Sequence, residues 1–262
     1  MREMAELFLR EAAARPDCPE ALIGHRISGV TCLYFGDFSG AHDHFQQAIE
    51  LYDQARHGDF ANRFGQDPRA GAEVYDALTL WVLGRVDEAL RLADRALADA
   101  ESAAHAPTMA HALNFAALLG LFRCNPEIVS TYSQALADIV SRYDFPASWA
   151  GRAAFFQGWA KWSDDAEDSS LAEMRRGLAI YLEQGLVWFL PSFGAALAEA
   201  EASTGEIAAG LQGLDDALAE AERTEQRWYE AEMHRIRAGI LLKRNPSDTA
   251  AAERSLQAAI GI

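Results

Sequence analysis

Three polar side chains near the end of the sequence have a spacing that suits ligand contact. Glu230, His234 and Arg237 are separated by four and three residues, so a helix would carry all three on one face. A carboxylate, an imidazole and a guanidinium placed together could contact an anion or a carboxylate. The same pattern is also typical of a polar face that meets only water, and the sequence leaves both interpretations open.

Three tryptophans recur at a nearly constant interval. Trp149, Trp188 and Trp228 are 39 and 40 residues apart, which predicts the same place, the first turn of the first helix, in three successive repeats. One interpretation is an aromatic surface that holds a peptide or an apolar ligand. The other is that each ring packs against the second helix of the preceding repeat.

Metal ligation and catalysis find no local support in the sequence. His42 and His44 are two residues apart on an expected helix, so their side chains diverge by about 200°. There is no Cys-x-x-Cys pair, no Gly-x-x-x-x-Gly-Lys-Ser/Thr loop and no Gly-x-Gly-x-x-Gly after a strand. We therefore expect a protein that is not an enzyme, with no metal site and no cofactor.

Charge, hydrophobic pattern and cysteine content limit the classes of partner and the location that we expect. The net charge of -16 repels phosphate backbones, so nucleic acid is not an expected partner. No run of about 18 apolar residues suggests a membrane span, and the start lacks the apolar core of a secretory signal. The three cysteines are an odd number, which favours buried thiols over disulfides. Because reduced thiols are typical of the cytoplasm, we expect a cytoplasmic protein.

The elements that must position these residues are helices arranged in pairs. Five junctions share an apolar helix end, a short polar turn and a second amphipathic helix, as in "WVLGRVDEALRLADRAL" and "EASTGEIAAGLQGLDDAL". The turn positions taken as equivalent are Gly36, Gly84, Arg123, Asp165 and Gly205, at spacings of 48, 39, 42 and 40 residues. The pattern indicates an internal repeat of near 40 residues, against about 34 for tetratricopeptide repeats.

The fold class that follows is all-α. We expect a right-handed α-solenoid of about six tetratricopeptide-like hairpins within a single domain, 1–262. A leading helix at 1–16 precedes them and resembles the middle of a longer solenoid, which favours a fragment. The expected hairpins are 21–54, 68–104, 107–143, 147–184, 188–224 and 229–260, with an inserted loop at 55–67.

The loop and its flanks form a basic region on an acidic chain, with Arg56, His57, Arg63 and Arg69. It could fold back and pair with acidic side chains of its own solenoid. Alternatively it docks another domain, with Phe60 and Phe64 as anchors and Arg63 among the arginines that pair with carboxylates.

Several stretches carry a family resemblance. The strings "GHRISGVTCLYFGDFSGAHDHFQQAIELYD", "RFGQDP", "ALTLWVLGRVDEALRLADRAL" and "RWYEAEMHRIRAGILL" resemble the C-terminal tetratricopeptide-like region of bacterial signalling proteins that pair a class III adenylate cyclase domain with a predicted ATPase module. The resemblance covers nearly the whole chain. Its most specific parts are Phe64 to Pro68 and Trp228 to Arg235, and "KWSDDAEDSSL" departs from it.

The resemblance implies a regulatory role beside catalytic domains that this chain lacks. We expect a noncatalytic scaffold for protein–protein or interdomain contacts, whose partner is another protein or the upstream domains of the same polypeptide. The alternative is a sensor that binds a small-molecule effector in the concave face of the solenoid. The candidate contacts are Phe60, Arg63, Phe64, Trp149, Trp188, Trp228, Glu230, His234 and Arg237.

Overall fold

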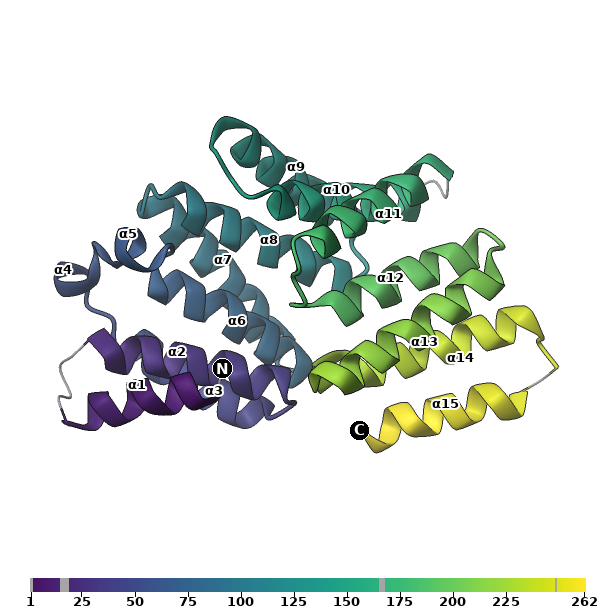
Figure 1. The fold of residues 1–262 in the computed structure, drawn as a ribbon, viewed down its shortest axis with the longest axis horizontal. Coiled ribbons are helices and arrows are strands. Elements are labelled where there is room, and N and C mark those ends of the chain that lie inside the picture. The colour runs from purple at the N-terminus through teal and green to yellow at the C-terminus, as the bar shows by residue number, and fades with distance from the viewer. Residues whose placement is uncertain (1, 15–18, 165–167, 248) are drawn as a thin grey trace. The chain divides into compact units, whose positions relative to one another are not determined.

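The secondary structure of the chain is helical throughout the described part. The computed structural model describes residues 2–14, 19–164, 168–247 and 249–262, and no strand occurs in these ranges (Figure 1). The helices are α1 (Arg2–Ala14), α2 (Pro19–Tyr34), α3 (Phe38–Leu51), α4 (Gln54–His57), α5 (Phe60–Phe64), α6 (Pro68–Val82), α7 (Val86–Ser102), α8 (Ala106–Phe122), α9 (Pro126–Arg142), α10 (Ala147–Asp164), α11 (Asp168–Glu183), α12 (Leu190–Ser203), α13 (Ile207–Thr224), the 3-10 helix η1 (Arg227–Tyr229), α14 (Glu230–Arg244) and α15 (Thr249–Gly261). The all-α prediction is confirmed.

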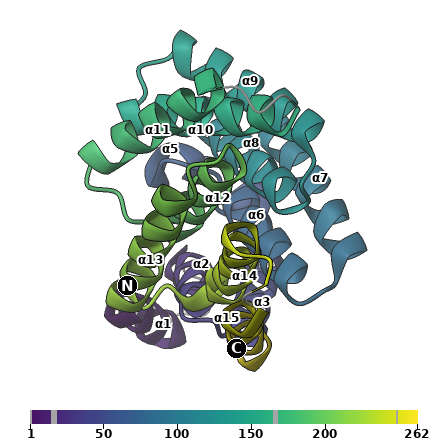
Figure 2. The same ribbon diagram turned by 90° about the vertical axis from the view of Figure 1, so that its right-hand side faces the viewer.

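Neighbouring helices in the sequence pack as adjacent pairs. Helix α2 packs on α3, α6 on α7, α10 on α11, α12 on α13 and α14 on α15, as Figures 1 and 2 show from two sides. These five pairs correspond to the expected hairpins 21–54, 68–104, 147–184, 188–224 and 229–260, so the array of helical hairpins is confirmed. Every helix of the described ranges is too short or too polar to cross a lipid bilayer.

Two compact units make up the chain, Met1–Leu119 and Gly120–Ile262, and the division falls inside α8. They are called the N-terminal and the C-terminal unit below. The single domain 1–262 and the right-handed superhelix stay predictions.

Capping side chains set several helix starts. The Asp67 carboxylate accepts hydrogen bonds from the backbone amides of Arg69 and Ala70, with Pro68 at the first helical position of α6. Asn125 caps α9 in the same way, accepting from the amide of Ile128 at 3.0 Å. At both starts the capping side chain precedes a proline, which has no backbone N–H to leave unpaired.

The turns within the hairpins require a residue that can adopt the left-handed backbone conformation, rather than a residue that is merely small. Gly84 and Gly205 have φ of 76° and 103°, and no atom lies within 4 Å of where a Cβ would stand. These two glycines therefore serve the left-handed backbone of the turn and not a close approach of the helices. In the third hairpin the left-handed residue is Cys124, with φ 50°, so the equivalent position is not Arg123. Position 165 lies outside the described residues.

Close approach does occur further along α13. A Cβ on Gly210 would lie 2.6 Å from the carbonyl oxygen of Ala198, so only glycine lets α13 pack this tightly on α12. The tight contact fixes the position of α13, which forms a wall of both grooves described below.

The inserted segment is ordered by two short helices, α4 and α5, and is tied to the helices around it. The hydroxyl of Tyr52 donates to Asp67 Oδ2 at 2.8 Å, and the amide of Asp67 donates to Thr108 Oγ1 at 2.8 Å. His57 is buried and its Nδ1 accepts from the amide of Asp53. The expected loop at 55–67 is thus mostly helical turns.

Candidate functional site

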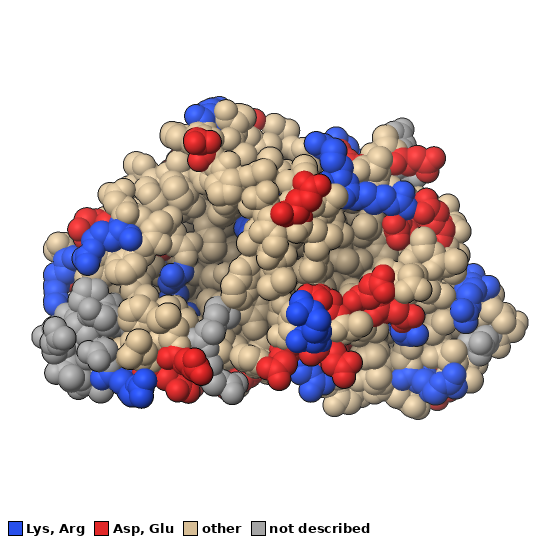
Figure 3. Space-filling view, in the orientation of Figure 1, with Lys and Arg blue, Asp and Glu red and all other residues tan. Residues whose placement is uncertain are grey.

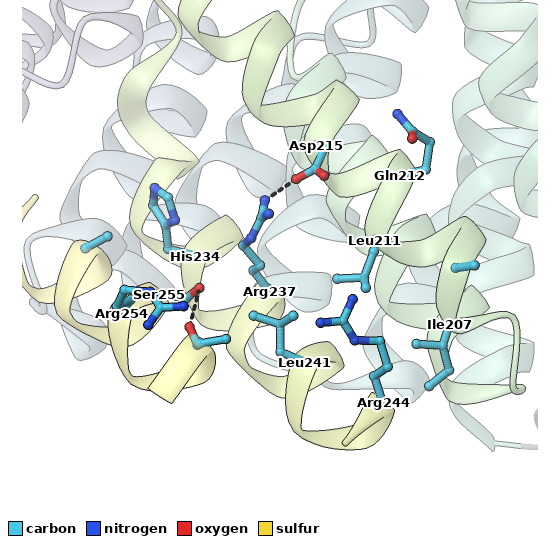
Figure 4. A pocket seen from close by; sticks show the side chains of 13 residues that line it. Ile207, Leu211, Gln212, Asp215, His234, Arg237, Leu241, Arg244, Arg254 and Ser255 are labelled. Atoms are coloured by element: carbon cyan, nitrogen blue, oxygen red, sulfur yellow. Dashed lines mark hydrogen bonds and ion pairs between the residues drawn. The ribbon is translucent and has the colours of Figure 1, made fainter. Parts of the chain in front are cut away.

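A groove in the C-terminal unit brings two of the expected contact residues together. Three helices line it, α13, α14 and α15, and it encloses about 770 Å³ (Figure 4). Its lining consists of Ile207, Ala208, Leu211, Gln212, Asp215, His234, Arg237, Leu241, Arg244, Ala251, Arg254, Ser255 and Ala258. We call it the basic groove.

Each helix contributes one stripe of side chains to this groove. On α14 the lining residues follow one another at intervals of three, four and three, the spacing that keeps side chains on one helix face. Leu241 belongs to a buried apolar cluster with Ala238 and Ala252, against which Leu211 packs. The base of the groove is thus anchored in the core, and its charged side chains stand above an apolar layer.

The charges in the groove are mainly positive. Arg237 on α14 forms an ion pair with Asp215 on α13, and Asp215 is the single carboxylate among the described residues that line the groove (Figure 4). Arg244 and Arg254 are exposed, and no hydrogen bond or ion pair holds either of them within the described residues. The groove therefore has an excess of positive charge on a chain whose net charge is -16.

Elsewhere charges of both signs are interspersed. Lys, Arg, Asp and Glu lie among each other on the face shown in Figure 3. On α14 itself, Arg235 outside the groove pairs with Glu232 at 2.7 Å and with Glu199 at 3.2 Å. The unpaired arginines of the basic groove are therefore available to an anionic ligand.

A second groove lies on the other side of α13 and has different chemistry. It encloses about 590 Å³ between the end of α11, the turn 184–189, α12 and α13. Its apolar lining includes Leu178, Leu182, Leu186, Val187, Leu190 and Leu197. The charged side chains at its edge are already bonded: Glu220 to Arg223 at 2.5 Å and Glu201 to Arg175 at 2.8 Å. We call it the apolar groove.

The expected trio on α14 is divided by the structure. His234 and Arg237 both line the basic groove. Glu230 does not; it accepts a hydrogen bond from Arg227 Nε at 2.7 Å, at the first turn of α14. Helical spacing placed the three residues correctly on one helix, but the groove begins one turn beyond Glu230.

The three tryptophans do not occupy equivalent places. Trp149 lies in the first turn of α10, as expected, with the Arg152 guanidinium 4.8 Å from its ring centre. Trp188 precedes α12, because Phe189 takes a left-handed conformation with φ 59° and the helix begins after it. Trp228 lies in η1 before α14. The expected common position is therefore wrong for two of the three.

Their burial differs as well. Trp228 is 4% exposed and packs edge-on against Phe122 and Phe189, at 5.4 and 5.3 Å between ring centres. This ring is part of the core. Trp149 and Trp188 are half-buried, and their role as contacts stays a prediction.

In the inserted segment, the phenylalanines expected as anchors differ in exposure. Phe60 is 2% exposed and packs against His57, so a partner cannot reach it and it is not a docking anchor. Phe64 is 38% exposed, and the Arg63 guanidinium lies 5.5 Å from its ring centre. Arg69 belongs to α6 and pairs with Glu73 and Asp99, which agrees with the interpretation that this region pairs internally.

Sequence reasoning missed Arg244 and Arg254. The interval of seven between Arg237 and Arg244 places both on one face of α14, so spacing alone could have found Arg244. Arg254 comes from the next helix, and the way α15 lies against α14 is not encoded in any spacing.

Comparison with known proteins gives a distant relative of unestablished function. No known protein-family profile matches the chain. The uncharacterized protein R02095 of Rhizobium meliloti (strain 1021) is 30% identical over 237 residues, which cover 88% of this chain and 23% of that protein. The chain thus spans about a quarter of the length of this curated relative.

Proposed function

We propose that the chain is a noncatalytic helical-repeat scaffold whose basic groove holds an acidic segment of a partner protein or of another domain of the same polypeptide. The observation that carries the proposal is the pair of exposed, unpaired arginines, Arg244 and Arg254, above an apolar layer. Guanidinium groups bind carboxylates through paired hydrogen bonds, and the apolar layer accommodates the hydrocarbon part of the segment.

The resemblance of "RFGQDP" and "RWYEAEMHRIRAGILL" to bacterial signalling proteins suggests where the acidic segment resides. We propose a cyclase or ATPase domain of the same signalling polypeptide. The much greater length of the Rhizobium relative is compatible with such an arrangement, since it leaves room for further domains.

The test uses a fluorescein-labelled hexaglutamate peptide as a probe of the groove. Fluorescence anisotropy at low salt is expected to show saturable binding to the full chain, and the double variant R244Q/R254Q should weaken it at least about tenfold, because two charge-assisted hydrogen bonds are lost. Binding should also weaken as salt is added.

The matched control is R123Q/R142Q, which removes two charges from the same unit outside the groove. Neither Arg123 nor Arg142 is held by a hydrogen bond or an ion pair within the described residues. Equal weakening by both double variants would mean that the probe responds to overall charge, and the groove would lose its assigned role.

A second candidate function rests on the apolar groove. Its volume of about 590 Å³ falls in the range of small-ligand sites, about 300–1,000 Å³, and its lining is mostly aliphatic. Under this candidate the chain senses an apolar effector. Titration with 8-anilinonaphthalene-1-sulfonate should quench tryptophan emission saturably, and Leu186→Glu in the turn should abolish this while Leu256→Glu, outside both grooves, should not.

A further inference from the structure

Arg26, on α2 of the N-terminal unit, is a half-buried charge without a partner among the described residues. Its Nε is sealed from solvent and makes no hydrogen bond, and no hydrogen bond or ion pair links its guanidinium to any other residue of the described ranges. The residue as a whole is half-buried, so part of it faces solvent. Shielded polar atoms in folded proteins nearly always have a partner, and here the chain supplies none.

The other enclosed charges of this unit are held by neighbours. Glu73 is bound by Arg69 and Arg95, and Asp76 by His42 and Gln46. A charged side chain that is shielded from water and has no partner lowers the stability of the fold. The Oε2 atom of Glu73 also lacks a hydrogen bond, but this carboxylate is paired through its Oε1, whereas Arg26 has no ion pair among the described residues.

A second donor lies beside this guanidinium. A Cβ on Gly71 of α6 would stand 3.3 Å from Arg26 Nη1 and 3.2 Å from Gln66 Nε2, so both groups meet over this glycine. Glycine at 71 leaves their nitrogen atoms uncovered on that side. Gln66 belongs to the "RFGQDP" run at the end of the inserted segment.

Asp67 is the acidic residue whose charge acts on Arg26, but it forms no ion pair with the guanidinium. Asp67 attracts Arg26 electrostatically, but its Oδ1 accepts the amides of Arg69 and Ala70 and its Oδ2 accepts the hydroxyl of Tyr52. The carboxylate is therefore committed to capping α6 and to holding the inserted segment. The guanidinium keeps its own hydrogen-bonding capacity.

We propose that Arg26 and the Gln66 amide, brought together over Gly71, form a binding site for a small oxyanion, a carboxylate or a phosphate group. The planar guanidinium would bind two of its oxygens, and the amide would donate to one of the same two in a carboxylate or to a third in a phosphate. Burial lowers the pKa of Arg26, as expected of a cation that lacks its counter-ion. The site is independent of the basic groove, which lies in the other unit.

Thermal melting of the full chain tests the site. Inorganic phosphate and succinate, each compared with chloride at constant ionic strength, separate the two oxyanion classes. At least one should raise the melting temperature by a few degrees with saturation. The variant R26M should lose this rise and, in chloride alone, melt no lower than the wild type, because it removes an uncompensated charge.

The control R10M removes the same charge from the exposed Arg10 of α1 and should keep the rise. As a direct readout, the Nε–Hε resonance of Arg26 should shift with the saturating anion. Three results would each overturn the site: no saturable rise with either anion, a rise that persists in R26M, or an R26M protein that melts well below the wild type in chloride.

Discussion

Two sets of charged residues, one in the core around α6 and one in the basic groove, differ in burial and in whether they have partners. Glu73 and Asp76 have no exposed surface, and each is held by two partners, at 2.8 and 3.1 Å for Glu73 and at 2.8 and 2.6 Å for Asp76. Arg244 and Arg254 are exposed and have none among the described residues. A charge deprived of water destabilises the fold unless a partner or a ligand compensates it, whereas an exposed charge is stabilised by water and needs no partner.

The difference separates structural charges from those that a ligand can use. Around α6 the pairs join α3 to α6 and α6 to α7, since Asp76 is bound by His42 and Gln46 and Glu73 by Arg95. Among the described residues that line the basic groove, Arg237 alone makes such a link, to Asp215. The predictions below test this distinction, from the largest expected effect to the smallest.

The double variant R69M/R95M should destabilise the folded chain most. It leaves the carboxylate of Glu73 enclosed without a cation, which typically costs about 3–5 kcal/mol. Urea unfolding measures the loss, and the triple variant with Glu73→Gln added should recover much of it. A double variant as stable as the wild type would show that Glu73 does not depend on its arginines.

The wild-type chain should lose stability as the pH rises through the range 4.5 to 6. Burial raises the pKa of Glu73 from 4.5 to about 6, although Arg95 and Arg69 oppose it. Because the folded-state pKa lies above the unfolded one, the folded chain holds this proton more tightly. The contribution is full below about pH 4.5 and is lost as the pH passes 6.

The size of this contribution is about 2 kcal/mol. Unfolding free energies of the wild type and Glu73→Gln, measured across this range, isolate it, because other titrating groups such as Asp76 are common to both. Parallel pH profiles for the two proteins would contradict the assignment.

The smallest effect is expected in the basic groove. R244Q/R254Q should change the unfolding free energy by less than about 0.5 kcal/mol, since neither arginine supports a neighbour. Its effect should appear in probe binding alone. A large loss of stability would place these arginines in the same class as those around Glu73.

Much of the fold could be predicted from the sequence because its signals are local. The caps at Asp67 and Asn125 and the hairpin period rest on residues a few positions apart. The turn at Cys124 was misplaced by one residue because no glycine marks the left-handed position there. Trp188 was misplaced because the backbone of Phe189 delays the start of α12.

The candidate site was predicted only in part, for a related reason. His234 and Arg237 share one helix, so their spacing brings them together. Arg254 reaches the same groove through the packing of α15, and Phe60 turned inward because its ring completes a small core with His57 and Phe64. Contacts between elements depend on tertiary packing, which a single sequence does not display.

Helix α13 borders both grooves, and consecutive residues serve different ones. Asp215 lines the basic groove and Asp216 the apolar groove. One residue of an α-helix corresponds to about 100° of rotation, so deleting a single residue between Ile207 and Leu211 would turn both faces away from their partners at once. The helix should therefore tolerate exchange of one side chain for another far better than any change in its length.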